Sequence, residues 1–219
     1  MRAPWKVPSA KWAGLIAEVE SRMANREPAH DLLHVRRVVD NVLVLSRVEN
    51  VGKTDEAIAA TGALLHEVFT LPKDDPQSST AGDTCALHAT AILQAAGAPS
   101  WLTEGAAAAI REHAFSKGAV PSTVASELLQ DADRLDALGA IGLARMWATC
   151  ADMKRPFYAT DDPFCQTRAP DDKQWGLDHV MKKLLLIPER LHTNAARELA
   201  KPRIAYLRAF LAQLEAEIV

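Results

Sequence analysis

Side chains that bind metals stand at three separated points of this chain. They are His34, the adjacent pair His66 and Glu67, and the acidic run Asp131-Ala132-Asp133-Arg134-Leu135-Asp136. Each lies in otherwise apolar sequence, where burying an unpaired carboxylate costs on the order of several kcal/mol. Two imidazoles and two carboxylates from separate segments would hold one divalent cation and leave positions open for a substrate.

His34 lies in a segment that predicts a helix, with other polar residues close by in the sequence. Asp31, one turn earlier, could orient the imidazole ring or simply cap the helix. His30 shares the face of His34 and could replace it as a ligand. A lone histidine on a helix is more often structural, so the segment alone does not decide between these readings.

The acidic run is flanked almost entirely by apolar residues, so its charges need partners. Asp133 and Asp136 are one helical turn apart, whereas Asp131 points elsewhere, and only part of the run can therefore address one ion. The alternative is an internal ion-pair network of Arg134 with Asp131 or Asp136.

Charge and composition restrict the partners. The 219 residues carry a formal net charge of -3, with 48% hydrophobic residues and a pI near 6.2. A protein that grips long nucleic acid normally has a basic patch, and the sequence has none, so we expect no nucleic-acid polymer as a partner.

Cysteines and apolar segments indicate the compartment. Cys85, Cys150 and Cys165 are widely spaced and odd in number, which argues against a disulfide framework. The N-terminus lacks a signal-peptide pattern, and no segment approaches the roughly 20 apolar residues that span a bilayer. We therefore predict a soluble, cytoplasmic protein with no membrane partner.

Hydrophobic periodicity predicts an all-α fold without strands. The expected helices cover about 9–24, 31–49, 54–68, 82–96, 100–114, 122–137, 139–151, 176–186 and 193–218, with an irregular, proline-containing stretch at about 152–174. Thr54 looks like a helix cap, and Gly62 would let another helix approach closely below His66. We predict one domain over residues 1–219, with its core at about 29–151 and the C-terminal helices at 176–218 packed on it.

The order His34, His66-Glu67, Asp133 resembles the H…HD…D pattern of the HD superfamily of metal-dependent phosphohydrolases. Longer segments resemble small stand-alone bacterial HD proteins: His34-Val35-Arg36-Arg37-Val38, Leu64-Leu65-His66, Arg111 to Ser116, Asp131 to Gly142 and Asp178 to Leu185. The resemblance runs from about Ala29 to the end of the chain. It implies a single compact multi-helix HD-domain bundle.

By this resemblance the metal ligands are His34, His66, Glu67 and Asp133. Asp133 matches better than Asp131, since the last aspartate of the family directly precedes a basic residue. Asp133, Glu67 and His113 would take part in catalysis, with His113 as a general acid or a hydrogen-bond donor to phosphate. Glu67 departs from the family's aspartate by one methylene, which displaces the carboxylate by about a bond length, whereas metal sites tolerate roughly ±0.2 Å.

The implied activity is hydrolysis of a phosphoester or phosphoanhydride in a small, nucleotide-like substrate by a metal-activated water. Mixed imidazole and carboxylate ligation suits one Mn²⁺ or Mg²⁺, with Fe²⁺ as a further option. We assign Lys73 and Arg37 to binding the substrate's phosphates, although Lys73 could equally be an ordinary exposed lysine.

Two other functions stay open. One is a catalytically silent helical binding module, in which the His-Glu doublet is a degenerate metal site. The other is a di-metal oxygenase, with His88 and His113 adding a second ion. The sequence indicates no role for His179 or His192, no particular substrate and no oligomeric state.

Overall fold

The computed structural model describes residues 11–71 and 80–218, apart from the side chains of Lys11 and Ser116. Within these residues the regular structure is helical and no strand occurs, so the predicted all-α fold is confirmed. The chain divides into two compact units, Met1–Asp133 and Arg134–Val219. The arrangement of these units as one domain stays a prediction, and Lys73 falls outside the described residues.

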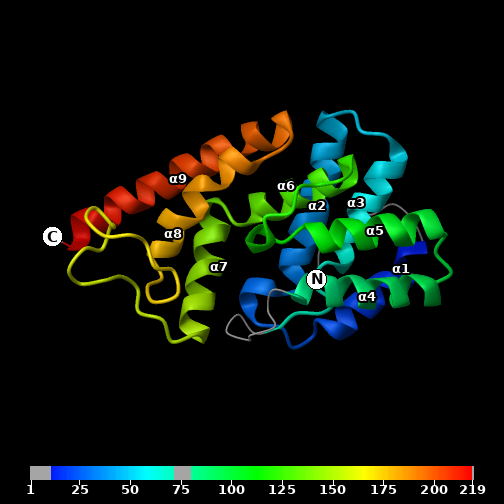
Figure 1. Ribbon diagram of the computed structural model, residues 1–219, viewed down its shortest axis with the longest axis horizontal. Coiled ribbons are helices and arrows are strands. Elements are labelled where there is room, and N and C mark those ends of the chain that lie inside the picture. The colour runs from blue at the N-terminus through cyan, green and yellow to red at the C-terminus, as the bar shows by residue number, and fades with distance from the viewer. Residues whose placement is uncertain (1–10, 72–79, 219) are drawn as a thin grey trace. The chain divides into compact units, whose positions relative to one another are not determined.

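The first unit holds the helices that carry the candidate ligands (Figure 1). Its elements are α1 (Lys11–Arg22), the 3-10 helix η1 (Pro28–His30), α2 (Leu32–Val48), α3 (Lys53–Leu65), α4 (Ala81–Ala95), α5 (Ser100–Glu112), the 3-10 helix η3 (Phe115–Lys117) and α6 (Val124–Asp136), whose last turn belongs to the second unit. Helix α3 packs against both α2 and α5, and α5 also packs against α4. Helix α3 is therefore the central element of this unit.

Burial of α3 explains its composition. Every residue from 59 to 65 is buried, so this stretch is apolar or small on all sides. A Cβ at Gly62 would meet Leu129 Cδ2 at 3.1 Å and Ala109 Cβ at 3.6 Å, which confirms the predicted close approach of a neighbouring helix. The predicted cap was wrong, because α3 begins at Lys53, after Gly52 in extended conformation.

Helix α2 is a valine-rich helix held by one buried stripe. Its valines at positions 35, 38, 39 and 42 are all buried, so tertiary packing outweighs their modest helix propensity. Asp31 is the N-cap, and its carboxylate accepts a hydrogen bond from the backbone N–H of His34 at 2.9 Å. The cap fixes where α2 begins and hence the turn on which His34 lies.

The second unit contains α7 (Gly139–Asp152), α8 (Asp178–Lys182), the 3-10 helix η4 (Leu184–Arg190) and α9 (Asn194–Ile218), with α7 packed along α9. The predicted helix at 176–186 was wrong in extent. Lys183 leaves the helical conformation, with φ -129° and ψ -57°, and ends α8 after five residues. Pro188 lies within η4, where it has no backbone N–H to donate.

The irregular stretch before α8 is ordered by two carboxylates. Asp162 accepts hydrogen bonds from the backbone N–H groups of Gln166 and Thr167. The buried carboxylate of Asp178 accepts hydrogen bonds from both terminal nitrogens of Arg168, at 2.5 and 2.8 Å. These bonds pin a segment that lacks regular hydrogen bonding, and its predicted irregularity is confirmed.

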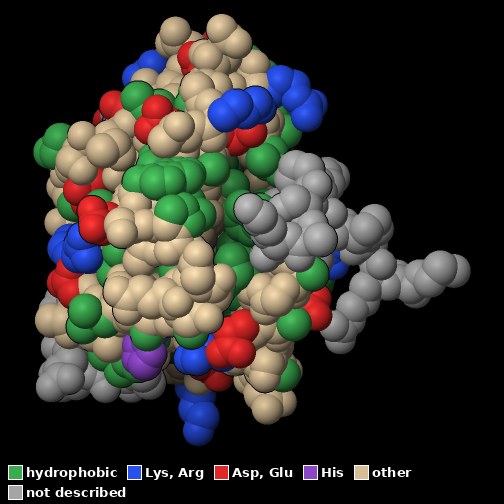
Figure 2. All heavy atoms as spheres, turned by 90° about the vertical axis from the view of Figure 1, so that its right-hand side faces the viewer, with side chains coloured by type: hydrophobic (Ala, Val, Ile, Leu, Met, Phe, Trp, Pro, Cys, Tyr) green, Lys and Arg blue, Asp and Glu red, His purple; other side chains and the backbone are tan. Residues whose placement is uncertain are grey.

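The surface mixes charges of both signs. On the face shown in Figure 2, Lys and Arg side chains lie among Asp and Glu, and apolar side chains gather near its centre. Among the described helices, none has the length and apolar content that a bilayer crossing requires.

Two glycine-to-alanine substitutions should act in opposite directions. A Cβ at Gly105 of α5 would lie 2.8 to 3.1 Å from three atoms of Ile58 on α3, so Gly105→Ala should destabilise by about 1–3 kcal/mol. Gly14 of α1 is exposed with nothing within 4 Å, so Gly14→Ala should stabilise by up to about 1 kcal/mol. Urea unfolding measures both. A stabilised Gly105→Ala variant would show that α3 and α5 are packed more loosely than described.

Candidate metal centre

Three of the predicted ligands converge in the first unit. The Nε2 atoms of His34 and His66 are 3.1 Å apart. Asp133 Oδ1 lies 3.5 Å from the first of these nitrogens and 4.0 Å from the second. Both histidines are buried, whereas the side chain of Asp133 is 24% exposed. His66 follows His34 by 32 residues and precedes Asp133 by 67 residues. Each of the three nevertheless presents one ligand atom to a common point.

These separations fit a shared cation. Ligand atoms about 2.1 Å from one ion are about 3.0 Å apart when at right angles and about 4.2 Å apart when opposite. The observed distances of 3.1, 3.5 and 4.0 Å fall between these limits. Two imidazoles and a carboxylate on one side of an ion leave its other positions open. The three residues thus fit the metal that the sequence pattern implies.

The histidine rings are oriented by the ends of two helices. His66 directly follows α3, and its Nδ1 is 2.7 Å from the carbonyl oxygen of Ala63. His113 directly follows α5, and its Nδ1 is 2.6 Å from the carbonyl oxygen of Ile110. A carbonyl oxygen only accepts, so Nδ1 carries the proton in each ring and Nε2 is left for the site.

His113 lies beside the three converging residues. Its ring centroid is 5.3 Å from that of His66, in an edge-to-face arrangement. Burial and the neighbouring His66 lower the pKa of His113, which favours the neutral ring. Its Nε2 therefore presents a lone pair, which can accept a hydrogen bond or a proton.

Glu67 is buried next to the converging group without being one of its three members. Its Oε2 has no hydrogen-bond partner among the described residues. Leaving a buried polar oxygen without a hydrogen bond costs about 1–3 kcal/mol, and a nearby cation would offset that cost. The assignment of Glu67 as the fourth ligand stays a prediction.

The turn that carries His66 and Glu67 is anchored by side chains. Cys85 Sγ on α4 donates to the carbonyl oxygens of His66, at 3.2 Å, and Leu65, at 3.4 Å. Burial raises the pKa of the Cys85 thiol to about 12, so it keeps the proton that it donates. Arg26 Nη2 donates to the carbonyl oxygen of Glu67 at 3.2 Å. Neither residue was identified from the sequence, where nothing relates them to the doublet.

Two further charges of the acidic run, Asp136 and Arg134, have partners in the second unit. Asp136 forms an ion pair with Arg145 at 3.1 Å, within the second unit. Arg134 Nη1 donates to His192 Nε2 at 2.9 Å and to the carbonyl oxygen of Arg190. His192 therefore helps to hold the arginine that follows the candidate ligand, a role that its isolated position in the sequence did not indicate.

The remaining candidates are not among the three converging residues. His30 pairs with Glu27, and its ring centroid is 6.1 Å from that of His34. His88 stacks on Phe69 at 4.9 Å, and it is not one of the converging residues. Arg37 is half-buried on α2, one turn after His34. Its role in phosphate binding stays a prediction.

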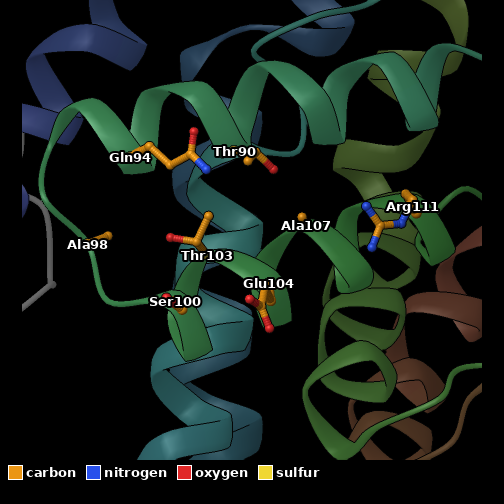
Figure 3. A pocket seen from close by; sticks show the side chains of 8 residues that line it. All are labelled: Thr90, Gln94, Ala98, Ser100, Thr103, Glu104, Ala107 and Arg111. Atoms are coloured by element: carbon orange, nitrogen blue, oxygen red, sulfur yellow. The ribbon is translucent and has the colours of Figure 1, made fainter.

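A separate hollow of about 230 Å³ lies between α4 and α5. Figure 3 shows Thr90 and Gln94 of α4 facing Thr103 and Glu104 of α5, with Arg111 farther along α5. None of the candidate ligands lines this hollow. It is distinct from the metal centre.

Known proteins similar to this chain were found by both sequence and structure. The chain is 27% identical over 204 residues to YpgQ of Bacillus subtilis, an uncharacterised protein, and the match covers 91% of this chain and 90% of that one. The crystal structure of YpgQ in complex with ADP superimposes with a TM-score of 0.69 at 25% identity, over 93% of this chain and 97% of the other. No protein-family model matches the chain.

The family resemblance is supported by the crystal structure of a HD-superfamily hydrolase of Bacillus thuringiensis. Its crystal structure is 29% identical to this chain, with a TM-score of 0.66, and the match covers 92% of this chain and 93% of that one. The resemblance to the HD superfamily is confirmed. This HD-superfamily neighbour supports a metal-dependent hydrolase. A protein of Lactobacillus plantarum at 22% identity, with a TM-score of 0.77 and coverage of 96% and 98%, shares the fold.

The metal centre can be tested without an assay of activity. Purified protein dialysed against Mn²⁺ should retain one ion per chain, measured by elemental analysis, and at 100 times its dissociation constant the ion should stabilise the fold by about 2.7 kcal/mol. Asp133→Asn keeps the shape of the side chain but removes its charge, so it should lose the ion and the stabilisation. His88→Ala is the control and should retain both. Equal retention by all three proteins would refute the site.

Proposed function

We propose that the protein is a divalent-metal-dependent hydrolase of phosphoester or phosphoanhydride bonds in a small, nucleotide-like substrate. The convergence of His34, His66 and Asp133 carries the proposal, because these three donors come from separate helices and meet within bonding range of one ion. Mn²⁺ or Mg²⁺ suits the donor set, with Fe²⁺ as a further option.

A divalent ion at this centre would lower the pKa of a coordinated water towards about 7 and polarise a phosphoryl oxygen. His34 and His66 present their Nε2 atoms from buried rings, and Asp133 supplies a carboxylate on the more exposed side. Glu67 adds a second carboxylate next to this group, and we assign it to the fourth ligand position.

His113 is the residue of the site that can exchange a proton with the substrate. Its Nδ1 is committed to the carbonyl oxygen of Ile110, so its Nε2 carries the lone pair that can accept a proton from the attacking water. This modifies the expectation of a general acid, since the lowered pKa of the ring disfavours a proton on Nε2 in the absence of substrate. Donation to the leaving oxygen would follow only after the ring has accepted that proton.

The proposed substrate class rests on a similar protein and on two basic residues of the sequence. YpgQ, which resembles this chain over most of its length, has been crystallised in complex with ADP. Arg37 lies one turn beyond His34 on α2, and we assign its guanidinium to the substrate's phosphates, together with Lys73. A nucleoside di- or triphosphate would bring both a scissile phosphoanhydride and the charge that these side chains recognise.

Two readings from the sequence compete with this proposal. A silent binding module would leave the buried Oε2 of Glu67 uncompensated, and the fit of the three ligand distances to a common ion favours a working centre. Two histidines and one carboxylate also bind iron in oxygenases, so the donor set alone does not exclude that chemistry. The two-ion version needs His88, which stacks on Phe69 instead of joining the ligands.

A substrate screen tests the proposal. Nucleoside mono-, di- and triphosphates and chromogenic phosphoesters are incubated with added Mn²⁺, and phosphate or pyrophosphate release is measured. Asp133→Ala should abolish turnover, because it removes the charged ligand. Glu67→Asp should preserve or raise turnover, because it restores the carboxylate position of the family pattern. His113→Ala should lower kcat by roughly 10²–10⁴ if the ring exchanges a proton.

The control for this screen is His88→Ala, which should match the wild-type protein. Turnover that survives Asp133→Ala would show that the activity comes from another site or a contaminant. Oxygen consumption with two irons per chain would favour the oxygenase instead.

A further inference from the structure

Two carboxamide side chains, those of Asn41 and Gln130, donate hydrogen bonds to the carbonyl groups that directly precede Asp133 and His113. Asn41 Nδ2 on α2 donates to the carbonyl oxygen of Ala132 at 3.0 Å, in the peptide unit that precedes Asp133. Gln130 Nε2 on α6 donates to the carbonyl oxygen of Glu112 at 2.8 Å, in the peptide unit that precedes His113. Each bond crosses from one helix to another, so each sets the spacing of two elements that carry site residues.

The position of Asn41 connects His34 to Asp133. It follows His34 by seven residues, which is two helical turns, so both side chains leave the same face of α2. The His34 imidazole lies 3.5 Å from the Asp133 carboxylate, and the Asn41 amide donates a hydrogen bond to the Ala132 carbonyl. The two contacts fix both the distance and the rotation of α6 relative to α2. Asn41 therefore controls where the carboxylate of Asp133 lies relative to the histidines.

The position of Gln130 connects Asp133 to His113. It is one turn before Asp133 on α6 and fully buried. Its amide donates to Glu112 and also, at 3.1 Å, to the carbonyl oxygen of Ala119. Glu112 is the last residue of α5, so its carbonyl has no partner within that helix. A single side chain thus closes the loop from Glu112 to Ala119 and holds the end of α5 that presents His113.

We propose that Asn41 and Gln130 are positioning residues with separate effects on the site. Asn41 places Asp133 for the cation, so its loss acts on metal affinity. Gln130 places His113 for proton exchange, so its loss acts on turnover and leaves the three converging ligands in place. The second half rests on the function proposed above, whereas the first depends only on the metal centre.

The test compares three variants in which an apolar side chain replaces a polar one of similar size. Asn41→Leu and Gln130→Met remove the two clamps. Thr61→Val is the matched control, because among the described residues the buried Thr61 hydroxyl donates to the carbonyl oxygen of Ala57, on its own helix. Dissociation constants for Mn²⁺ come from the electron paramagnetic resonance signal of the free ion. Unfolding in the presence of chelator measures the structural cost of each change separately.

Partners that orient ligands and catalytic groups typically contribute about 10–100-fold to metal affinity or activity. Asn41→Leu should therefore weaken Mn²⁺ binding by about tenfold or more and restore kcat near the wild-type value at saturating metal. Gln130→Met should leave the dissociation constant close to that of Thr61→Val and lower kcat by about tenfold or more, with little change in KM.

Combining Gln130→Met with His113→Ala separates positioning from a general structural effect. If Gln130 acts through His113, the double variant should be no slower than His113→Ala alone. Additive losses would overturn the assignment of Gln130. Unchanged Mn²⁺ affinity in Asn41→Leu, or an equal loss in Thr61→Val, would overturn the assignment of Asn41.

A spectroscopic readout keeps the two halves testable if the wild-type protein hydrolyses nothing in the screen. The imidazole resonances of His113, assigned by their loss in His113→Ala, should shift in Gln130→Met and stay in place in Thr61→Val. Unmoved resonances would refute the role of Gln130 independently of any activity. A missing activity together with shifted resonances and weakened metal binding would count against the proposed function alone.

Discussion

The centre depends on a simple constraint at the ends of helices. The last carbonyl groups of a helix have no partner within it, and a buried helix end must satisfy them in another way. In α3 and α5 the next residue is a histidine whose Nδ1–H turns back to a carbonyl three residues earlier. One hydrogen bond thereby caps the helix, selects the tautomer and directs Nε2 outward. The helix ends and the site are stabilised by the same contact.

A second consequence is that the centre is assembled by contacts with the backbone. The peptide units around it accept bonds from Cys85, Arg26, Asn41 and Gln130, on four different segments. Because these bonds are made to main-chain atoms, they fix the position of the backbone from which a ligand side chain extends. The polar atoms of that side chain stay available to bind the ion. This suits a group that must bind an ion, because a side chain engaged by a neighbour would be a poorer ligand.

The resemblance to the HD superfamily named His34, His66 and Asp133, and the structure brings these three side chains together. The sequence itself predicted the helices from hydrophobic periodicity, and it offered Asp31 as either a helix cap or a partner of the His34 ring, of which the structure shows the cap. It failed at the helix expected for 176–186, where the break after Lys182 depends on a backbone conformation that no periodicity reveals. It also missed Asn41, Gln130 and Cys85. Their roles come from contacts 91, 18 and 19 residues away in sequence, and an amide or a thiol in a helix has no pattern that identifies its partner. Glu67 is an intermediate case. The family pattern assigns it as a ligand because it directly follows His66, and the structure shows that it is buried, but its binding to the ion stays a prediction.

The three ligands differ in burial, and this difference bears on how an ion would bind to the centre and be released from it. Both imidazoles are sealed in the interior, while the Asp133 carboxylate is partly wet. A bound ion would contact the solvent side through this carboxylate, while the two buried nitrogens would hold it from the interior. First-row divalent metals differ widely in intrinsic affinity for such donors. If ions reach the centre from its exposed side, the metal available in the surroundings would select the occupant.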